Sequence, residues 1–414
     1  MQRKNSLTAA LMAAAVLTTG VAVNMVDVPV AVAQAKPQNS KAAGPVLKQA
    51  KTALDSKKWQ EAIAKAKEVQ GTSGKNAYDD YLANEILYFA YAKTNQFADA
   101  AKSLETSLES EYLPKAEVPK RSRQLLTMYY QLKSYDKVIA LGDKAAKEGW
   151  ADDDVNTWVG QAYYQKGDYK GAAKYVEASV NSLQKAGKKP KEQALLLVQS
   201  SCDKSGDTAC KQRALEDLVA NYPKPQYWQN LMAALNDADT NDQTRLQVFR
   251  LSVAVDTLKR PSDFTEFAQL ALDAGSPGEA QTVLEKGFEK KIFVEKRDVD
   301  RNQRLLDKAK QQATTDKAAL DKMASDAAAG KSGDKDINVG LAYLGYQQYD
   351  KAVEALNRGL SKPGLAKPAE ARLLLGIAQL NAGKKDDARK SFKQVKGDPT
   401  LERIANLWSL HSQA

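Results

Sequence analysis

The amino-acid sequence predicts an all-α fold: a superhelical solenoid of antiparallel helical hairpins with a C-terminal capping helix. Three observations support this prediction. One hairpin pattern recurs along the chain, prolines fall between its copies, and no sustained apolar alternation indicates strands. Proline lacks an amide donor and clashes with the preceding helical turn, so its place between hairpins permits continuous helices. These prolines are Pro114, Pro223, Pro225, Pro261 and Pro363.

The clearest copy of the pattern begins at a small residue, Gly160, which lets a second helix approach closely. Tyr163 fills the space between the two helices. Gly167 turns the chain, because glycine adopts a left-handed backbone conformation without a steric penalty. Tyr169 and Ala172 then pack the returning helix. The segment therefore reads as one helix-turn-helix hairpin.

Further copies hold the same register. Two of them are specific, with Gly340, Tyr343, Tyr349 and Ala352 in one and Gly376, Gly383, Ala388 and Phe392 in the other. Five looser copies can be placed in the same register. The first contains Trp59 and Ala62; the second contains Tyr88, Tyr91, Phe97 and Ala100; the third contains Leu126, Tyr129, Tyr135 and Val138; the fourth keeps Gly206; and the fifth contains Gly275, Ala280 and Gly287. With roughly nine units, the chain resembles the tetratricopeptide repeat superfamily, and specifically an exported bacterial member. The resemblance implies an array that binds partners on a concave surface and has no active site.

Residues 1–33 have the features of a secretory signal peptide. Two basic residues precede an apolar run at 7–23, and small residues at 31–33 offer a cleavage site. We expect cleavage after residue 33 or 35, followed by a flexible leader over 34–44. An uncleaved membrane anchor is the alternative, because the apolar run is near the lower length for spanning a bilayer.

The mature chain is expected to contain a repeat array over 45–293, long polar connecting helices over 294–332, and a C-terminal repeat pair with a capping helix over 333–414. The connecting segment is one long helix or two shorter ones, or else a degenerate repeat that has lost its turn. Its weak apolar stripe consists of Leu305, Ala309, Ala313, Leu320 and Ala324. The capping helix protects the terminal core of the solenoid through Leu401, Ile404, Leu407 and Trp408.

The formal net charge of +10 comes mostly from lysine. One interpretation is a solubilising coat on helix surfaces, and the other is attraction to anionic partners such as acidic peptide segments, cell-wall polymer or lipid head groups. We expect no nucleic-acid partner, because the protein is predicted to be exported and no dense basic patch is interleaved with aromatics.

The two cysteines, Cys202 and Cys210, fall late in one helix and early in the next, so they face each other across a turn. These positions predict a disulfide in an oxidising compartment. Closing so short a loop stabilises by about 2–3 kcal/mol in the chain-entropy model. Two free core thiols and a redox pair are the alternatives.

Three sequence features resemble parts of phosphate-binding, calcium-binding or catalytic sites, but each lacks residues that such a site requires. Gly330, Lys331 and Ser332 match the end of a phosphate loop, but no strand precedes them and the first glycine is missing. A calcium-loop start at 237–241 lacks its glycine and its distal glutamate. The single histidine, His411, has no second histidine with which to form a catalytic or metal-binding set. We therefore expect no catalytic residues, no metal site and no cofactor.

Carrying the family's inner positions onto this register predicts a partner-binding face formed by three adjacent hairpins. The predicted residues are Phe89, Lys93, Arg123, Thr127, Tyr130, Gln131, Thr157, Gln161, Tyr164 and Gln165. Amides can pair with a peptide backbone while rings cover its side chains, which suits an extended or helical segment of another protein. Tolerated surface residues are the alternative interpretation of this set.

The sequence thus predicts a non-catalytic periplasmic scaffold that binds protein or peptide segments of the cell envelope, with no transmembrane span in the mature chain. The alternative function is a cell-wall-associated accessory protein that binds glycan or an anionic envelope polymer.

Overall fold

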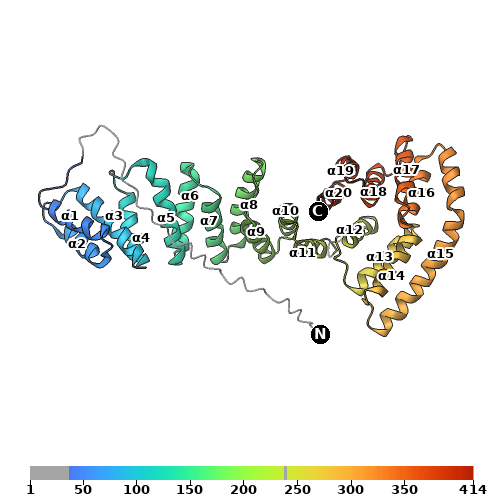
Figure 1. Cartoon of the computed structure of the whole chain (residues 1–414), viewed down its shortest axis with the longest axis horizontal. Coiled ribbons are helices and arrows are strands. Elements are labelled where there is room, and N and C mark those ends of the chain that lie inside the picture. The colour runs from blue at the N-terminus through green and yellow to red at the C-terminus, as the bar shows by residue number, and fades with distance from the viewer. Residues whose placement is uncertain (1–36, 237–239, 414) are drawn as a thin grey trace. The chain divides into compact units, whose positions relative to one another are not determined.

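A computed structural model describes residues 37–236 and 240–413. In this part of the chain all regular structure is helical (Figure 1). The predicted signal peptide and the residues 237 and 239 of the calcium-like motif lie outside the described residues. Contacts between residues group the chain into two units that divide after residue 166, and the predicted connecting segment 294–332 lies within the second unit.

The first unit contains three complete hairpins followed by one further helix. Its elements are α1 (Gly44–Asp55), α2 (Trp59–Gly71), α3 (Ala77–Lys93), α4 (Phe97–Leu108), the 3-10 turn η1 (Lys115–Glu117), α5 (Val118–Gln131), α6 (Tyr135–Glu148) and α7 (Asp153–Gln165). Each odd-numbered helix packs against the even-numbered helix that follows it, up to the α5–α6 pair. We call α1, α3, α5 and α7 the leading helices of this unit.

The second unit continues the hairpins and contains one much longer helix. Its helices are α8 (Tyr169–Lys185), α9 (Glu192–Ser205), α10 (Thr208–Asn221), α11 (Pro225–Asn236), α12 (Asp242–Ala254), α13 (Pro261–Asp273), α14 (Pro277–Glu289), α15 (Lys296–Ala329), α16 (Gly333–Gly345), α17 (Tyr349–Ser361), α18 (Pro368–Asn381), α19 (Lys385–Lys393) and α20 (Pro399–His411).

Small residues bring the two helices of a hairpin together as expected. A methyl group on Gly340 in α16 would lie 2.6 Å from Cγ of Leu356 in α17, and one on Gly376 in α18 would overlap the ring of Phe392 in α19. Leu356 and Phe392 are buried. Close packing of these apolar groups is therefore possible only where the facing helix carries no side chain.

The turn between paired helices uses one residue with a positive φ angle, whether or not that residue is glycine. Gly383 has φ 79° before α19, while Gln347 has φ 59° before α17, and Lys133 has φ 56° before α6. A residue with a Cβ is disfavoured by about 1–2 kcal/mol in this conformation. The hairpin geometry thus persists in units whose sequence lacks the turn glycine.

The segment after α14 forms one continuous helix, α15, of 34 residues. It packs against α13 and α14 through its first half and against α16 and α17 through its second. Its buried side is a single stripe of Asn302, Leu306, Ala309, Ala313, Leu320 and Ala327. The helix therefore joins the hairpin α13–α14 to the hairpin α16–α17.

The C-terminal helix α20 does more than cover the last hairpin. Leu401, Ile404, Leu407 and Trp408 are buried, as expected of a cap, and α20 contacts α18 and α19. It also contacts α10 and α12 (Figure 1). Arg403 pairs with Glu216 of α10. One apolar core thus runs from α8–α12 into α18–α20. The helix predicted to cap the last hairpin therefore also closes the second unit against α10 and α12.

Candidate binding surface

The leading helices α1, α3, α5 and α7 form one side of the first unit. The backbones of α1 and α3 approach each other closely, and so do those of α5 and α7. Within the described residues the backbones of α3 and α5 do not. The connection before α5 is long, because residues 109–117 contain Pro114 and the turn η1. Side chains therefore have to fill the space between α3 and α5.

Arg121 of α5 fills that space. Its guanidinium lies 2.5 Å from the carboxylate of Glu85 on α3 and packs over the rings of Tyr88 and Phe89, at 5.4 and 4.9 Å from their centres. The side chains of Arg121 and Glu85 are only 12% and 13% exposed. Burial raises the pKa of the Glu85 carboxyl, and the positive charge of Arg121 opposes that rise. This buried pair holds α5 against α3.

Arg123 and Tyr130 were predicted to face a partner, but both are directed at the next hairpin. Arg123 donates to the carbonyl oxygen of Trp150 at 3.0 Å and pairs with Asp152 at 2.9 Å. Asp152 in turn caps α7, accepting from the backbone N–H of Val155. Arg123 therefore fixes the start of α7 against α5.

The ring of Tyr130 lies 4.7 Å from that of Trp158 on α7 and 5.7 Å from that of Tyr135. Burial raises the pKa of the Tyr130 hydroxyl, and a hydrogen bond with Gln165 opposes the rise. Aromatic pairs at such distances contribute about 0.5–1.5 kcal/mol beyond the area they bury. Tyr130 and Gln165 thus stabilise the contact between α5 and α7, and truncating Tyr130 is expected to lower stability.

Other predicted residues lie on the side of the leading helices that faces away from the core, which we call the outer leading face. Residues of one helix share this face when they are three or four positions apart. The face consists of Leu82, Phe89 and Lys93 on α3, Lys120, Thr127 and Gln131 on α5, and Thr157, Gln161 and Tyr164 on α7. Lys93, Lys120 and Gln131 are exposed, and the other six are half-buried.

The two threonines of this face already use their hydroxyl groups as donors. Thr127 donates to the carbonyl oxygen of Arg123 at 3.0 Å, and Thr157 donates to that of Asp153 at 2.7 Å. Each hydroxyl oxygen can still accept a hydrogen bond. Among the polar groups of the face, Gln131 and Gln161 therefore supply the amide donors.

The outer leading face carries two exposed lysines, Lys93 and Lys120. Lys93 makes no ion pair with any described residue, and Lys120 has only a distant one, 3.9 Å from Glu117. Lys48, exposed on α1, likewise has no acidic partner among the residues described. Glu85 is turned inward to Arg121. The lysine charges are thus available to an anionic partner.

Sequence reasoning missed Leu82 and Lys120 of the outer leading face, and also Trp158, Arg121 and Lys48. Trp158 follows a predicted residue directly and occupies the side of α7 that meets α5, a position that helical periodicity could have identified. Arg121 gave no local signal, because its role depends on the long connection before α5. Lys48 lies in a hairpin whose repeat pattern is too degenerate to set its register.

The structure joins Cys202 and Cys210 in a disulfide between the end of α9 and the start of α10. Gly330 ends α15, so the segment resembling a phosphate loop follows a helix. His411 lies at the end of α20 against the rings of Trp228 and Trp408. Within the described residues no helix combines the length and apolar character needed to cross a membrane.

Comparison with known proteins gives one family match, to the tetratricopeptide repeat, over residues 340–401. No curated protein matches the chain. Among solved structures it is similar to a tetratricopeptide repeat protein from Parabacteroides merdae, with 10% identity, a TM-score of 0.32, and 72% of this chain and 99% of that chain covered. It is also similar to the TPR2AB domain of yeast Sti1 in a complex with pHSP90, with 15% identity, a TM-score of 0.25, and 72% and 100% covered.

The matched residues 340–401 span α17, α18 and α19, together with the C-terminal part of α16 and the start of α20. They include the close glycine contacts at Gly340 and Gly376. The same helix-turn-helix geometry recurs before and after α15, with a residue of positive φ at the turn. Residues 340–401 therefore match the tetratricopeptide repeat, and hairpins of the same geometry recur among the described residues outside this match.

Proposed function

We propose that this protein is a non-catalytic scaffold that binds an extended, acidic segment of another protein on the outer leading face of its first unit. The observation that carries the proposal is the composition of that face. It combines half-buried apolar groups, amide side chains and lysines without a close acidic partner, over three adjacent helices. Repeat proteins of this superfamily characteristically bind other proteins through such surfaces.

The chemistry of the face fits a polypeptide backbone. Gln131 and Gln161 each offer a donor and an acceptor, which is what an extended chain presents at every residue. Leu82 and Tyr164 supply apolar area, together with the part of the half-buried Phe89 ring that the Arg121 guanidinium does not cover. A segment in extended conformation rises about 3.3 Å per residue, so a short peptide spans several helices of about 10 Å diameter.

Charge selects an acidic segment over a basic one. Lys48, Lys93 and Lys120 lie on successive leading helices, and Glu85 is neutralised by Arg121. Clustered charge of one sign raises the association rate with an oppositely charged partner and is screened by salt. Binding should therefore weaken as ionic strength rises.

A peptide array tests this specificity. Extended peptides of one length, carrying acidic, neutral or basic residues on a common backbone, are probed with the purified protein at low and at physiological salt. We expect acidic peptides to bind best and the variant Lys93→Glu with Lys120→Glu to lose that preference. Reversal of Lys102 and Lys144, on α4 and α6, is the matched control. Equal binding to all peptides contradicts the proposal.

The array also separates a protein partner from an anionic polymer. A polymer held by charge alone depends on the lysines but not on the amides, so binding to polyphosphate would survive Gln131→Ala with Gln161→Ala. A peptide held through its backbone loses affinity in that variant. Retention of all acidic-ligand binding in the amide variant would support the cell-wall-associated alternative.

We further propose that the protein works in the periplasm, where it contributes to assembly of an envelope complex. The signal features of residues 1–33 support this location. The mass of the protein isolated from its native host should correspond to a mature N-terminus at Gln34 or Lys36. An intact N-terminus in the membrane fraction would support a retained anchor.

A further inference from the structure

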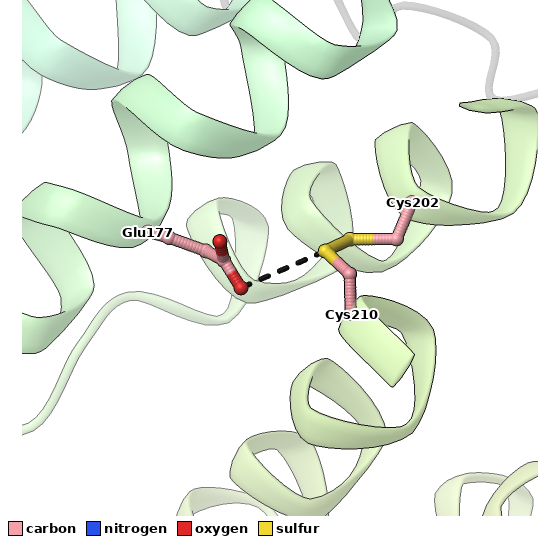
Figure 2. Close-up of side chains that lie close together, drawn as sticks. All are labelled: Glu177, Cys202 and Cys210. Carbon is pink, nitrogen blue, oxygen red and sulfur yellow. Dashed lines mark hydrogen bonds between the residues drawn. A yellow bond between two sulfur atoms is a disulfide. The ribbon is translucent and has the colours of Figure 1, made fainter. Parts of the chain in front are cut away.

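The disulfide of the second unit has a carboxylate beside it that no repeat pattern requires. Glu177 of α8 places Oε1 3.6 Å from Sγ of Cys210 (Figure 2). One ligand atom from each of Glu177, Cys202 and Cys210 lies within 4.8 Å of the other two. Cys202 is fully buried and Cys210 is 3% exposed, while Glu177 is half-buried at the edge of the group.

We propose that these three residues form a redox-gated site for a thiophilic divalent cation such as Zn²⁺. With the disulfide formed, neither sulfur is a thiolate and no site exists. After reduction, two thiolates and one carboxylate supply three ligands of the types that Zn²⁺ takes in proteins. Water completes the tetrahedron, because no fourth protein ligand lies in the group.

The reaction balances in two steps. A phosphine and one water molecule cleave the S–S bond: the phosphine supplies two electrons and takes the water oxygen as its oxide, and the two water protons give two thiols. The cation then displaces both thiol protons into solvent and binds the thiolates. Two thiolates, one carboxylate and Zn²⁺ leave one negative charge, which Arg213 balances from 3.4 Å beside Glu177.

The three helices hold the ligands in place independently of the sulfur–sulfur bond. Cys202 lies in the last turn of α9 and Cys210 in the first turn of α10, where its backbone N–H donates to the capping residue Asp207 at 2.9 Å. Glu177 lies in the middle of α8, which packs along α9. Reduction therefore leaves the three side chains near one another.

An ion can reach the site from the side of Glu177. A hollow of about 220 Å³ lies beside this residue between α8, α9 and α10, and Arg213 and Asp217 also line it. The volume exceeds that of several water molecules. Asp217 borders the hollow but is outside the group of close ligand atoms, so it serves as a matched control carboxylate.

Cobalt(II) is the probe, because its absorption reports thiolate ligation and tetrahedral geometry directly. The full chain is reduced with a phosphine, which does not supply a thiol ligand, and titrated with Co²⁺. We expect one ion per chain with a thiolate-to-cobalt charge-transfer band, displaced by Zn²⁺. The oxidised protein and the variant Cys202→Ser with Cys210→Ser should show no such band.

The variant Glu177→Gln distinguishes a three-ligand site from two cysteines alone. We expect it to bind Co²⁺ at least about 10-fold more weakly, while Asp217→Asn binds as the wild type does. Zn²⁺ should also slow reoxidation of the dithiol, because metal binding and disulfide formation compete for the same sulfurs. Absence of the charge-transfer band in the reduced wild type, or equal affinity in Glu177→Gln, overturns the proposal.

Discussion

Replacing Arg121 with methionine tests whether the buried Arg121–Glu85 pair holds α5 against α3. The substitution removes the cation from a side-chain pair that is 12% and 13% exposed, leaving Glu85 buried beside apolar groups. Breaking a buried pair by removing one partner typically costs about 3–5 kcal/mol. The variant Arg121→Met should therefore lose about this much stability in the first unit under alkaline conditions.

The loss should shrink under acidic conditions. Burial already raises the pKa of Glu85 in the native protein, and removing Arg121 removes the charge that opposes the rise. The folded variant then binds a proton that the unfolded chain has released, so its stability falls as pH rises between the unfolded and folded pKa values. Protonated Glu85 carries no charge, and the penalty below this window is smaller.

A second substitution isolates the charge from the packing. In the variant Arg121→Met with Glu85→Leu both polar partners are replaced by apolar groups, which is often neutral or stabilising at buried ion pairs. We expect stability to return to within about 1 kcal/mol of the wild type. Urea unfolding followed by circular dichroism gives the free energies, and hydrogen exchange in peptides of α3 and α5 assigns them to this contact. The reasoning is refuted if Arg121→Met lowers the free energy of unfolding by less than about 1 kcal/mol at alkaline pH. It is also refuted if the double variant is no more stable than Arg121→Met alone.

Three further predictions concern the second unit. Gln347→Gly should stabilise the protein by about 0.5 kcal/mol, because glycine relieves the positive φ angle at some cost in the entropy of the unfolded chain. Gly383→Ala should destabilise the protein by about 1 kcal/mol for the converse reason. Calorimetry in which the two melting temperatures do not shift in opposite directions would contradict this. Trp408→Ala, at a site 3% exposed, should cost about 3–5 kcal/mol and increase hydrogen exchange in α10 and α12, whereas exchange confined to α19 would show that α20 is only an end cap. Burial, together with the positive charge of Lys385, lowers the pKa of His411 below its usual 6.5. The stability that depends on neutral His411 should therefore be lost as pH falls below 6.5 toward the pKa of the folded state. In urea unfolding, the stability of His411→Gln should depend less on pH, and an unchanged dependence would exclude His411 as its source.

Local sequence signals predicted the hairpins correctly because each hairpin is a local structure. Gly340 and Gly376 mark close helix approaches, and the positive-φ turn keeps its place even at Gln347. The closure of the second unit gave no such signal. It depends on the apolar side of α20 meeting α10 and α12, and on Arg403 pairing with Glu216, which lies 187 positions earlier in the chain.

The candidate surface was predicted in part for the same reason. Helical periodicity placed Phe89, Gln131 and Gln161 on the outer leading face. It did not distinguish that face from the adjacent contact with the next hairpin, where Tyr130 packs on Trp158. A quarter-turn separates the two directions, and only the position of the neighbouring helix decides between them.

Site-specific photo-crosslinking in the native host tests the central claim most directly. A benzophenone side chain is placed at Lys93 or Gln131 on the outer leading face, and at Lys102 or Ala140, which are exposed on α4 and α6. We expect both leading-helix positions to give the same protein adduct, cross-linked through an acidic segment that mass spectrometry identifies, and the control positions to give none. Adducts of equal yield from Lys102 and Ala140, or none from Lys93 and Gln131, would contradict binding on this face.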